Sequence, residues 1–133
     1  MPVKKVKKPT KAKLMSECRD LWSLCVRARD KTCRLCGADS KLTAHHLRSV
    51  SNSSTVLDLE NGLTICWPEH SRQKWNPEAF QDKIIDCIGQ AEYDRLKVKS
   101  QVIFKWDVAT LLLEKQVLKD ALKRFQEGDC SAS

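Results

Sequence analysis

Three cysteines in a short window constrain the fold more than any other feature of this chain. Cys33 and Cys36 form a Cys-X2-Cys pair in "CRLC", and Cys66 ends the apolar run "GLTIC". A Cys-X2-Cys turn presents two thiolates to one metal ion, which is half of a tetrahedral zinc site. With Cys66 as a third sulfur ligand, the sequence predicts a structural zinc site.

The fourth zinc ligand is open between two neighbouring residues. In "ICWPEH", Glu69 stands three residues after Cys66, where a second pair would place its cysteine. A carboxylate oxygen is an acceptable zinc ligand, so Glu69 would complete a Cys3Glu site, whereas His70 would complete a Cys3His site. The remaining alternative is that zinc has been lost and the thiols pack as hydrophobic side chains.

The cysteine count and the N-terminus bear on the cellular compartment. The chain has seven cysteines, and an odd number fits a disulfide framework poorly. The N-terminal "MPVKKVKKPTKAKL" has no apolar segment of the secretory kind. No apolar run approaches the roughly 18 residues that span a bilayer. We therefore expect a reducing cytoplasm, where disulfides are rare, and no membrane partner.

Positive charge is concentrated at the N-terminus. Of the 24 Lys and Arg residues, six lie within residues 1–13, which contain no acid, so 18 basic side chains face 17 acidic ones in the rest of the chain. Contacts between lysines and phosphates release counterions, so such an arm suits polyanion binding. We expect residues 1–13 to be a disordered basic arm; the alternative is a solvated tail that mainly aids solubility. The six lysines are Lys4, Lys5, Lys7, Lys8, Lys11 and Lys13.

The 133 residues suffice for one domain, expected over residues 14–128 with a short tail at 129–133. The segment "LMSECRDLWSLCVRARD" has apolar residues at helical spacing, and Cys18 and Cys25 lie on that stripe as expected core residues. Two short strands, around "LTAHHL" and over Gly62–Cys66, suggest a β-hairpin with a long loop. The expected fold class is α+β.

The C-terminal half is predicted to be helical. Asn76 is a natural N-cap before Pro77, and Gly89 closes that helix. A shorter helix is expected over Gln90–Lys97. Asp107 can cap a last helix that ends at Gly128 and whose apolar stripe must pack against another element. The residues of that stripe are Leu111, Leu118, Leu122 and Phe125.

All three histidines of the chain, His45, His46 and His70, follow the Cys-X2-Cys pair, and they lie on both sides of Cys66. Adjacent residues on a strand point to opposite faces, so His45 and His46 need either two different roles or a bend between them. Imidazole is also the side chain best suited to accept a proton near neutral pH. A clustered trio of this kind favours a functional site over scattered structural histidines.

The pattern "CRLCG…AHHL…ENGLTIC..EH" resembles the signature of HNH nucleases. The resemblance implies a ββα-metal core over residues 33–76 with a zinc knuckle, flanked by an N-terminal helix and by C-terminal helices over residues 77–128. It implies that His45 and His70 bind a catalytic divalent ion and that His46 is the general base. Asn61 corresponds to the motif's asparagine, which helps to hold that base in place.

The departure from this family is Glu69, which stands where a fourth knuckle cysteine is usual. Segments on both sides of the motif, "LCVRARDKTCRLCG" and the C-terminal helices, are similar to lambdoid phage recombination endonucleases of the NinG (Rap) type. The similar segments cover most of residues 18–125. This resemblance implies a phage-infected or lysogenic bacterial host and branched recombination intermediates as substrate.

The expected function is therefore metal-dependent hydrolysis of DNA phosphodiester bonds, with His45, His46, His70 and Asn61 gathered around one cation. Imidazole ligands suit Mn²⁺ or Ni²⁺, and Mg²⁺ is the abundant physiological choice. Phosphate contacts are expected from residues flanking the motif and from the arm. The residues expected to contact DNA are Arg48, Arg72, Lys74, Lys4, Lys5, Lys7 and Lys8.

Several alternatives remain open at this stage. One is a non-catalytic zinc module that binds nucleic acid, and another is an HNH accessory nuclease of phage DNA packaging. Trp67 and Trp75 are expected to cap the small core near the zinc, with base stacking as the alternative. The long apolar stripe of the last helix would either pair with a second copy, giving a homodimer, or cover the core of one chain.

Overall fold

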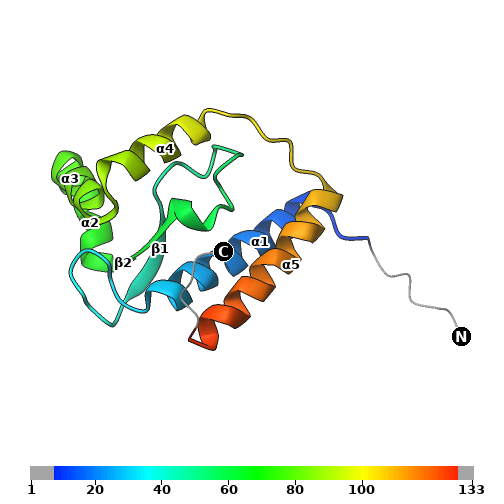
Figure 1. Cartoon of the computed structure of the whole chain (residues 1–133), viewed down its shortest axis with the longest axis horizontal. Helices are drawn as coiled ribbons and strands as arrows, with labels where there is room; N and C mark the ends of the chain where they lie inside the picture. The colour runs from blue at the N-terminus through cyan, green and yellow to red at the C-terminus, as the bar shows by residue number, and fades with distance from the viewer. Residues whose placement is uncertain (1–7, 129–133) are drawn as a thin grey trace, which may run out of the picture.

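The computed structural model describes residues 8–128 as an α+β fold, as predicted (Figure 1). This part of the chain forms five α-helices, one 3-10 helix and a two-stranded sheet. None of these helices is long and apolar enough to cross a bilayer. The elements are α1 (Lys11–Asp30), β1 (Leu42–His46), η1 (Leu59–Asn61), β2 (Gly62–Cys66), α2 (Trp67–Trp75), α3 (Pro77–Ile88), α4 (Gln90–Ser100) and α5 (Val108–Gln126).

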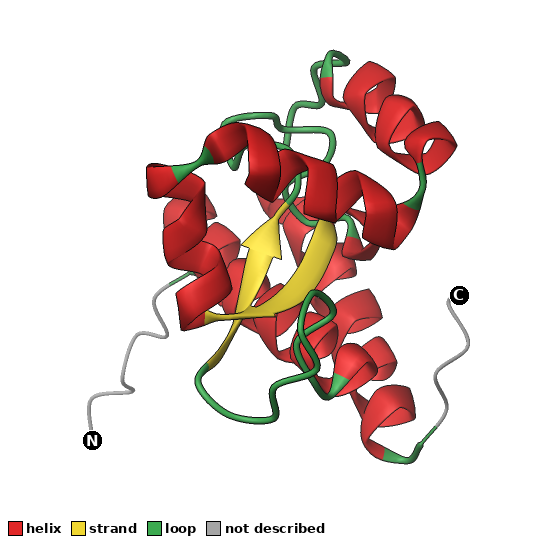
Figure 2. Ribbon diagram, turned by 90° about the vertical axis from the view of Figure 1, so that its left-hand side faces the viewer, coloured by secondary structure: helices red, strands yellow, loops and turns green. Residues whose placement is uncertain are grey.

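The two strands form an antiparallel hairpin that lies between two helical layers (Figure 2). Leu42 pairs with Cys66 at one end of the hairpin, and His46 pairs with Gly62 at the other. Because side chains alternate along a strand, Leu63 and Ile65 point toward α3, whereas Thr64 points toward α1. We call these two sides the α2/α3 face and the α1 face of the hairpin.

The larger core lies between α1 and α5, which run side by side in the same direction (Figure 1). The Sγ atoms of Cys18 and Cys25 donate to the carbonyl oxygens of Leu111 and Leu118, at 3.5 and 3.2 Å. Both cysteines are fully buried, which confirms their prediction as core residues. The apolar stripe predicted for the last helix packs here, with Leu111, Leu118 and Phe125 buried and Leu122 partly buried.

The helix ends follow the capping residues of the sequence. The side chain of Asn76 accepts from the backbone N–H of Ala79 at 3.2 Å, and Asp107 forms a capping box with Thr110 at the start of α5. Gly89 ends α3 with φ of 91°, a conformation that favours glycine. Each of these caps was predicted at its observed position.

The N-terminal boundary differs from the prediction. Thr10 caps α1, so the helix begins at Lys11 rather than Leu14, and Lys11 and Lys13 are helical instead of part of the arm. Lys8 is exposed. Lys4, Lys5 and Lys7, like the tail at 129–133, lie outside the described residues.

Helix α2 is the element that apolar periodicity does not indicate. Glu69 is its one buried residue, and Trp67 and Trp75 are 53% and 84% exposed. The expectation that these tryptophans cap the core is therefore wrong. On the outer side of α5, Leu112, Leu113 and Val117 are also exposed, and the homodimer through this helix stays a prediction.

Candidate functional site

The first candidate site is the group of Cys33, Cys36 and Cys66, which we call the three-thiol group. Their sulfur atoms lie within 4.8 Å of one another, with Cys36 Sγ 3.5 Å from Cys66 Sγ. Cys33 and Cys36 lie on a tight turn in which the N–H of Gly37 donates to the Cys33 carbonyl at 2.8 Å. Cys66 is the last residue of β2 and the N-cap of α2. The hairpin thus brings the third sulfur to the turn.

The pKa values of two cysteines in the three-thiol group are shifted in opposite directions. Burial raises the pKa of the Cys33 thiol, but hydrogen bonds from the backbone of Cys66, Cys36 and Leu35 outweigh burial and lower it. Burial also raises the pKa of Cys66 to about 11, against a backbone hydrogen bond from Glu69 that lowers it. Zinc–sulfur bonds of about 2.3 Å need sulfurs at roughly this spacing. These cysteines could therefore hold a metal ion, and zinc is among the ions that thiolates suit.

Neither residue considered as a fourth zinc ligand belongs to the three-thiol group as placed here. Glu69 is 5% exposed, and its Oε1 accepts from Lys83 Nζ at 2.9 Å. Its Oε2 lies 3.7 Å from Arg72 Nε, is buried, and accepts no hydrogen bond from any described residue. The Glu69 carboxylate therefore joins α2 to α3.

His45 and His70 form a pair on the α2/α3 face of the hairpin. Their ring centroids are 5.6 Å apart and the rings meet edge to face, so β1 and α2 each supply one imidazole. Phe80 packs against the other side of His45, with centroids 5.3 Å apart. Burial, together with the nearby His70 and His46, lowers the pKa of His45 to about 4. His45 is thus neutral at physiological pH, as a metal ligand must be.

His46 lies on the opposite, α1 face. Its ring stacks on Trp22 with centroids 3.7 Å apart and an angle of 9° between the planes. Its Nε2 lies 2.9 Å from the carbonyl oxygen of Val56. Burial lowers the pKa of His46, the hydrogen bond to Val56 raises it, and the charge of Arg19 lowers it further; the net shift is downward. An open polar hollow of about 410 Å³, bordered by Arg19 and Asp20, lies beside the ring.

Asn61 is fully buried and fixes the loop that follows the histidine doublet. Its Oδ1 accepts from the N–H of Arg48 at 2.7 Å. Its Nδ2 donates to the carbonyls of Arg48 and Thr55, at 3.1 and 3.0 Å. Thr55 directly precedes Val56, so Asn61 holds His46 through the backbone next to its partner rather than by bonding the ring itself.

The structure therefore brings together only part of the expected constellation. His45 and His70 lie together on one face of the hairpin, whereas the ring of His46 is on the other face beside α1. The expectation of three imidazoles in one pocket is not met, because strand alternation continues through the doublet without a bend. Across residues 8–128, three or more close metal-ligating groups occur only at the three thiols.

The predicted phosphate-contacting residues surround the hairpin end and α2. The Nε of Arg48 donates to Ser100 Oγ at 3.2 Å, which ties this arginine to α4. Arg72 and Lys74 are exposed on α2, the helix that carries His70, and Arg72 is the cation paired with Glu69. Lys74 has no ion-pair partner among the described residues and is available to an external anion.

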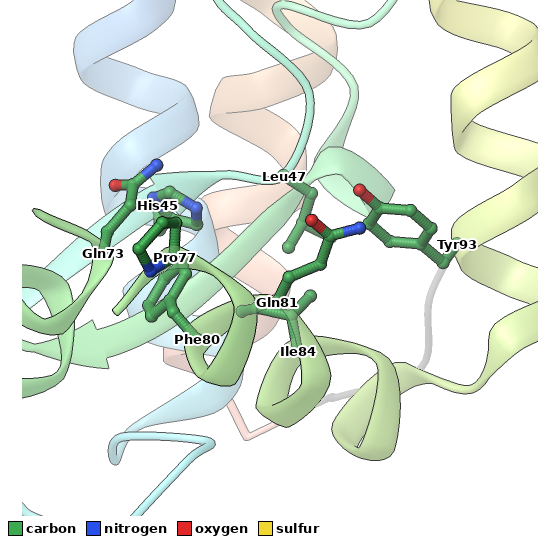
Figure 3. A pocket seen from close by; sticks show the side chains of 8 residues that line it. All are labelled: His45, Leu47, Gln73, Pro77, Phe80, Gln81, Ile84 and Tyr93. Atoms are coloured by element: carbon green, nitrogen blue, oxygen red, sulfur yellow. The ribbon is translucent and has the colours of Figure 1, made fainter. Parts of the chain in front are cut away.

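Three features of the site were missed by sequence reasoning. Trp22 belongs to the apolar stripe predicted for the first helix, and nothing in the sequence indicates that it also stacks on His46. The Val56 carbonyl has no sequence signal at all, because any residue supplies one. A hollow beside His45 is lined by Gln73, Gln81 and other residues of α2, α3 and α4 (Figure 3). These contacts join segments far apart in the chain.

Comparisons of this chain with protein-family models, with curated proteins and with solved structures found no match.

Proposed function

We propose that the chain is a metal-dependent DNA endonuclease with an HNH-type centre. In this proposal His45 and His70 bind the catalytic divalent ion, and His46 is the general base. One observation carries the proposal: the last two residues of β1 present imidazoles on its two sides, one facing His70 and the other held by a backbone carbonyl.

The hydrogen bond of His46 makes one ring nitrogen a base. A carbonyl oxygen only accepts hydrogen bonds, so the Nε2 of His46 carries the proton that it donates to Val56. In the neutral ring Nδ1 then keeps its lone pair, and the lowered pKa keeps the ring neutral at physiological pH. His46 would take the proton of the attacking water at Nδ1, a contribution of about 10²–10⁴-fold in rate.

The histidine pair could bind a divalent ion and leave coordination positions of that ion free for the substrate. Both ligands are neutral nitrogen donors from different elements, and two such ligands leave further positions for phosphate oxygens. When bound, Mg²⁺, Mn²⁺ or Ni²⁺ would stabilise charge on the phosphoryl group and on the leaving oxygen as a Lewis acid. The neutrality of His45 allows binding without displacing a proton.

The opposite orientation of the two imidazoles is compatible with in-line displacement at phosphorus. In such a reaction the attacking and leaving oxygens lie on opposite sides of the phosphorus atom. A general base is needed on the attacking side, and an ion held by His45 and His70 would stabilise the leaving oxygen on the other. In this proposal His46, on the α1 face, would take the first role, and the histidine pair, on the α2/α3 face, the second.

Several basic side chains support DNA as the partner. Lys74 and Arg72 lie within four residues of His70 on α2, where they would contact phosphates next to the reacting one. The lysines of residues 1–13 would add salt-dependent, sequence-independent affinity. The resemblance to NinG-type endonucleases supports branched recombination intermediates as the substrate.

A second candidate is a non-catalytic zinc module that binds nucleic acid. The observation that favours it is the three-thiol group, the one set of three close metal-ligating side chains within residues 8–128. This alternative gives no role to the tether between His46 and Val56 or to the clamp made by Asn61. For that reason the nuclease is the better-supported function.

Nicking of supercoiled plasmid with Mg²⁺ or Mn²⁺ tests the proposal. The informative variant is His46→Phe, which keeps a ring to stack on Trp22 but has no proton acceptor. We expect it to stay folded by circular dichroism and to lose nicking by about 10²–10⁴-fold. Gln101→Ala, at the exposed end of α4, is the control and should nick at the wild-type rate.

Two results would contradict the assignment. Nicking by His46→Phe at the wild-type rate would show that His46 is not the base. The zinc module would be favoured if the wild-type protein binds DNA in a salt-dependent way but does not nick it with Mg²⁺, Mn²⁺ or Ni²⁺.

A further inference from the structure

The hollow beside His45 lies on the α2/α3 face, at the side of the histidine pair (Figure 3). It has a volume of about 170 Å³, and residues of β1, α2, α3 and α4 line it. Sites for drug-sized ligands have volumes of about 300–1,000 Å³, so this hollow suits a much smaller planar group. His45 is part of its wall, so anything bound there lies next to the proposed catalytic ion.

Two carboxamides and a phenol provide its polar groups. Gln73 from α2 lies beside His45, and Gln81 from α3 extends toward the ring of Tyr93 from α4 (Figure 3). Among the described residues, none of these three side chains makes a hydrogen bond to another part of the protein. Both glutamines are exposed, and each carboxamide offers a donor and an acceptor to a ligand.

The remainder of the wall is apolar and aromatic. Phe80 and Ile84 of α3 are 4% and 3% exposed and form a rigid side of the hollow. The ring of Tyr93 faces the hollow from α4. Aromatic rings stack on nucleobases, and glutamine pairs with the hydrogen-bonding edge of a base, adenine above all. An apolar wall, a ring and two carboxamides are the groups that recognise a nucleobase.

We infer that this hollow binds one unpaired nucleobase of the DNA strand that is cut. A base inside a duplex is stacked and paired, so it cannot enter a hollow of this size without leaving the helix. The hollow therefore selects DNA that already has an unpaired nucleotide next to the cleaved bond, such as a flap, a bulge or a branch point. This inference rests on the proposed nuclease function and specifies its substrate class.

The described residues that line the hollow include no Lys, Arg, Asp or Glu, which suits an uncharged base, and basic residues flank Gln73 on α2. Gln73 lies between Arg72 and Lys74 in sequence, and both neighbours are exposed on α2. Lys74, which makes no ion pair with a described residue, would contact a backbone phosphate of the nucleotide whose base Gln73 holds. His45 lies beside Gln73 in the wall, so the nucleotide that holds this base is next to the proposed metal site (Figure 3).

A binding experiment with 2-aminopurine tests the inference independently of cleavage. This fluorescent adenine analogue is quenched when it stacks, and it is placed as the first unpaired nucleotide of a flapped duplex. The titration uses the full-length protein in buffer without added divalent ions. We expect quenching with the flap and none when the analogue lies inside a continuous duplex of the same sequence.

Matched variants test whether the fluorescence quenching comes from binding in the hollow. Gln73→Ala combined with Gln81→Ala should weaken binding of the flapped probe about tenfold, the size of one lost base contact. Gln101→Ala combined with Gln126→Ala removes two exposed carboxamides elsewhere and should bind as the wild type does. Equal binding and quenching by both double variants, or equal quenching of flapped and continuous probes, would overturn the inference.

Cleavage of the same DNAs with Mn²⁺ separates the two proposals. If the wild type cuts the flap and the glutamine variant loses that preference while still nicking plasmid, both proposals hold. If the protein cuts but the glutamine variant keeps the same preference, the hollow is excluded and the nuclease remains. If the probe is quenched but no DNA is cut, the nuclease fails and the hollow is a single-strand binding site.

Discussion

Two adjacent histidines differ because of what each ring meets on its own face of the hairpin. His45 meets His70 and Phe80, and burial there keeps it neutral to about pH 4. His46 meets Trp22 and the Val56 carbonyl. The sequence predicts that the two rings need different roles, because strand side chains alternate. It does not show which neighbours they meet, since Trp22 and His70 come from helices on either side.

The pH dependence of nicking should follow the lowered pKa of His46. The ring must be neutral to act as a base, so the rate should rise as pH increases through a pKa below 6.5 and level off above it. Arg19→Glu replaces a charge that disfavours protonation with one that favours it, which raises this pKa. We therefore expect the acidic limb to move to higher pH, with a lower rate at pH 6 relative to pH 8.

An NMR titration of the His46 ring checks the same shift without relying on activity. Arg19 is exposed, so the shift should be small and should grow at low salt. Lys123→Glu near the end of α5 makes the same change in charge away from the hollow and serves as the control. An Arg19→Glu profile identical to that of Lys123→Glu would mean that Arg19 does not act on His46.

Two other residues of the predicted site, Asn61 and Glu69, have partners that lie far away in the sequence. Asn61 was expected to orient His46, and its side chain instead bonds the backbone of Arg48 and Thr55, partners that depend on tertiary contacts. Glu69 was considered as a zinc ligand from its spacing after Cys66 alone. Its carboxylate instead meets Lys83, which is fourteen positions away on another helix and has no spacing signal.

At the scale of elements, the hairpin is fixed by close packing of α1 against one strand. A Cβ at Gly62 would lie 2.4 Å from Val26 Cγ2 and 2.7 Å from Trp22 Cζ2. The φ of Gly62 is −115°, which any residue adopts, so glycine is needed here for space alone. The same contact brings Trp22 to the position where His46, opposite Gly62 in the hairpin, stacks on it.

Gly62→Ala should therefore destabilise the fold by about 1–3 kcal/mol, the usual cost of an overpacked core. Urea denaturation measures this cost. The added methyl group pushes α1 away from β2, so Val26→Ala, which removes the closest atom, should recover part of the loss in the double variant. A double variant whose free energy of unfolding equals the sum of the two single losses would show that the two groups do not meet.

Sequence patterns predicted the elements whose signals are local. The caps at Asn76 and Asp107 and the glycine at the end of α3 are chemical signals within a few residues, and all three are observed. The apolar stripe of α5 predicted its buried face. Helix α2 has no such stripe: it begins directly after Cys66, and Glu69 is its one buried residue. Only the resemblance to HNH nucleases implied a helix there.

The whole molecule has two separate cores on either side of the hairpin. One joins α1 to α5, and the other joins the three-thiol group, β2 and α3. The second core is small, and Cys33 and Cys66 are among its buried residues. A metal ion bound by the three thiols would therefore stabilise the half of the molecule that carries His70.

Removal of the metal should unfold the second core and spare the first. We expect elemental analysis to find one zinc per chain, and a strong chelator to lower the helical signal in circular dichroism only in part. Limited proteolysis should then cut within residues 67–88, while α1 and α5 stay protected. Cys87→Ser is the matched control, because this thiol lies near the group but outside it, and its zinc content should not change.

A chain that contains zinc but keeps its full helical signal and protease resistance after chelation would contradict this division. Loss of all helical signal in one step would equally show that the two cores unfold together.

Because the hairpin has two faces, the proton affinity of His46 and the proposed ion affinity of His45 and His70 depend on different parts of the chain. Substitutions on α1 adjust how readily the second imidazole of the doublet gains a proton. In the proposed nuclease, substitutions on α2 and α3 would adjust how tightly the first imidazole and its partner hold a cation. A single strand thus carries two imidazoles whose surroundings come from different helices, and the charge of the second still acts on the pKa of the first.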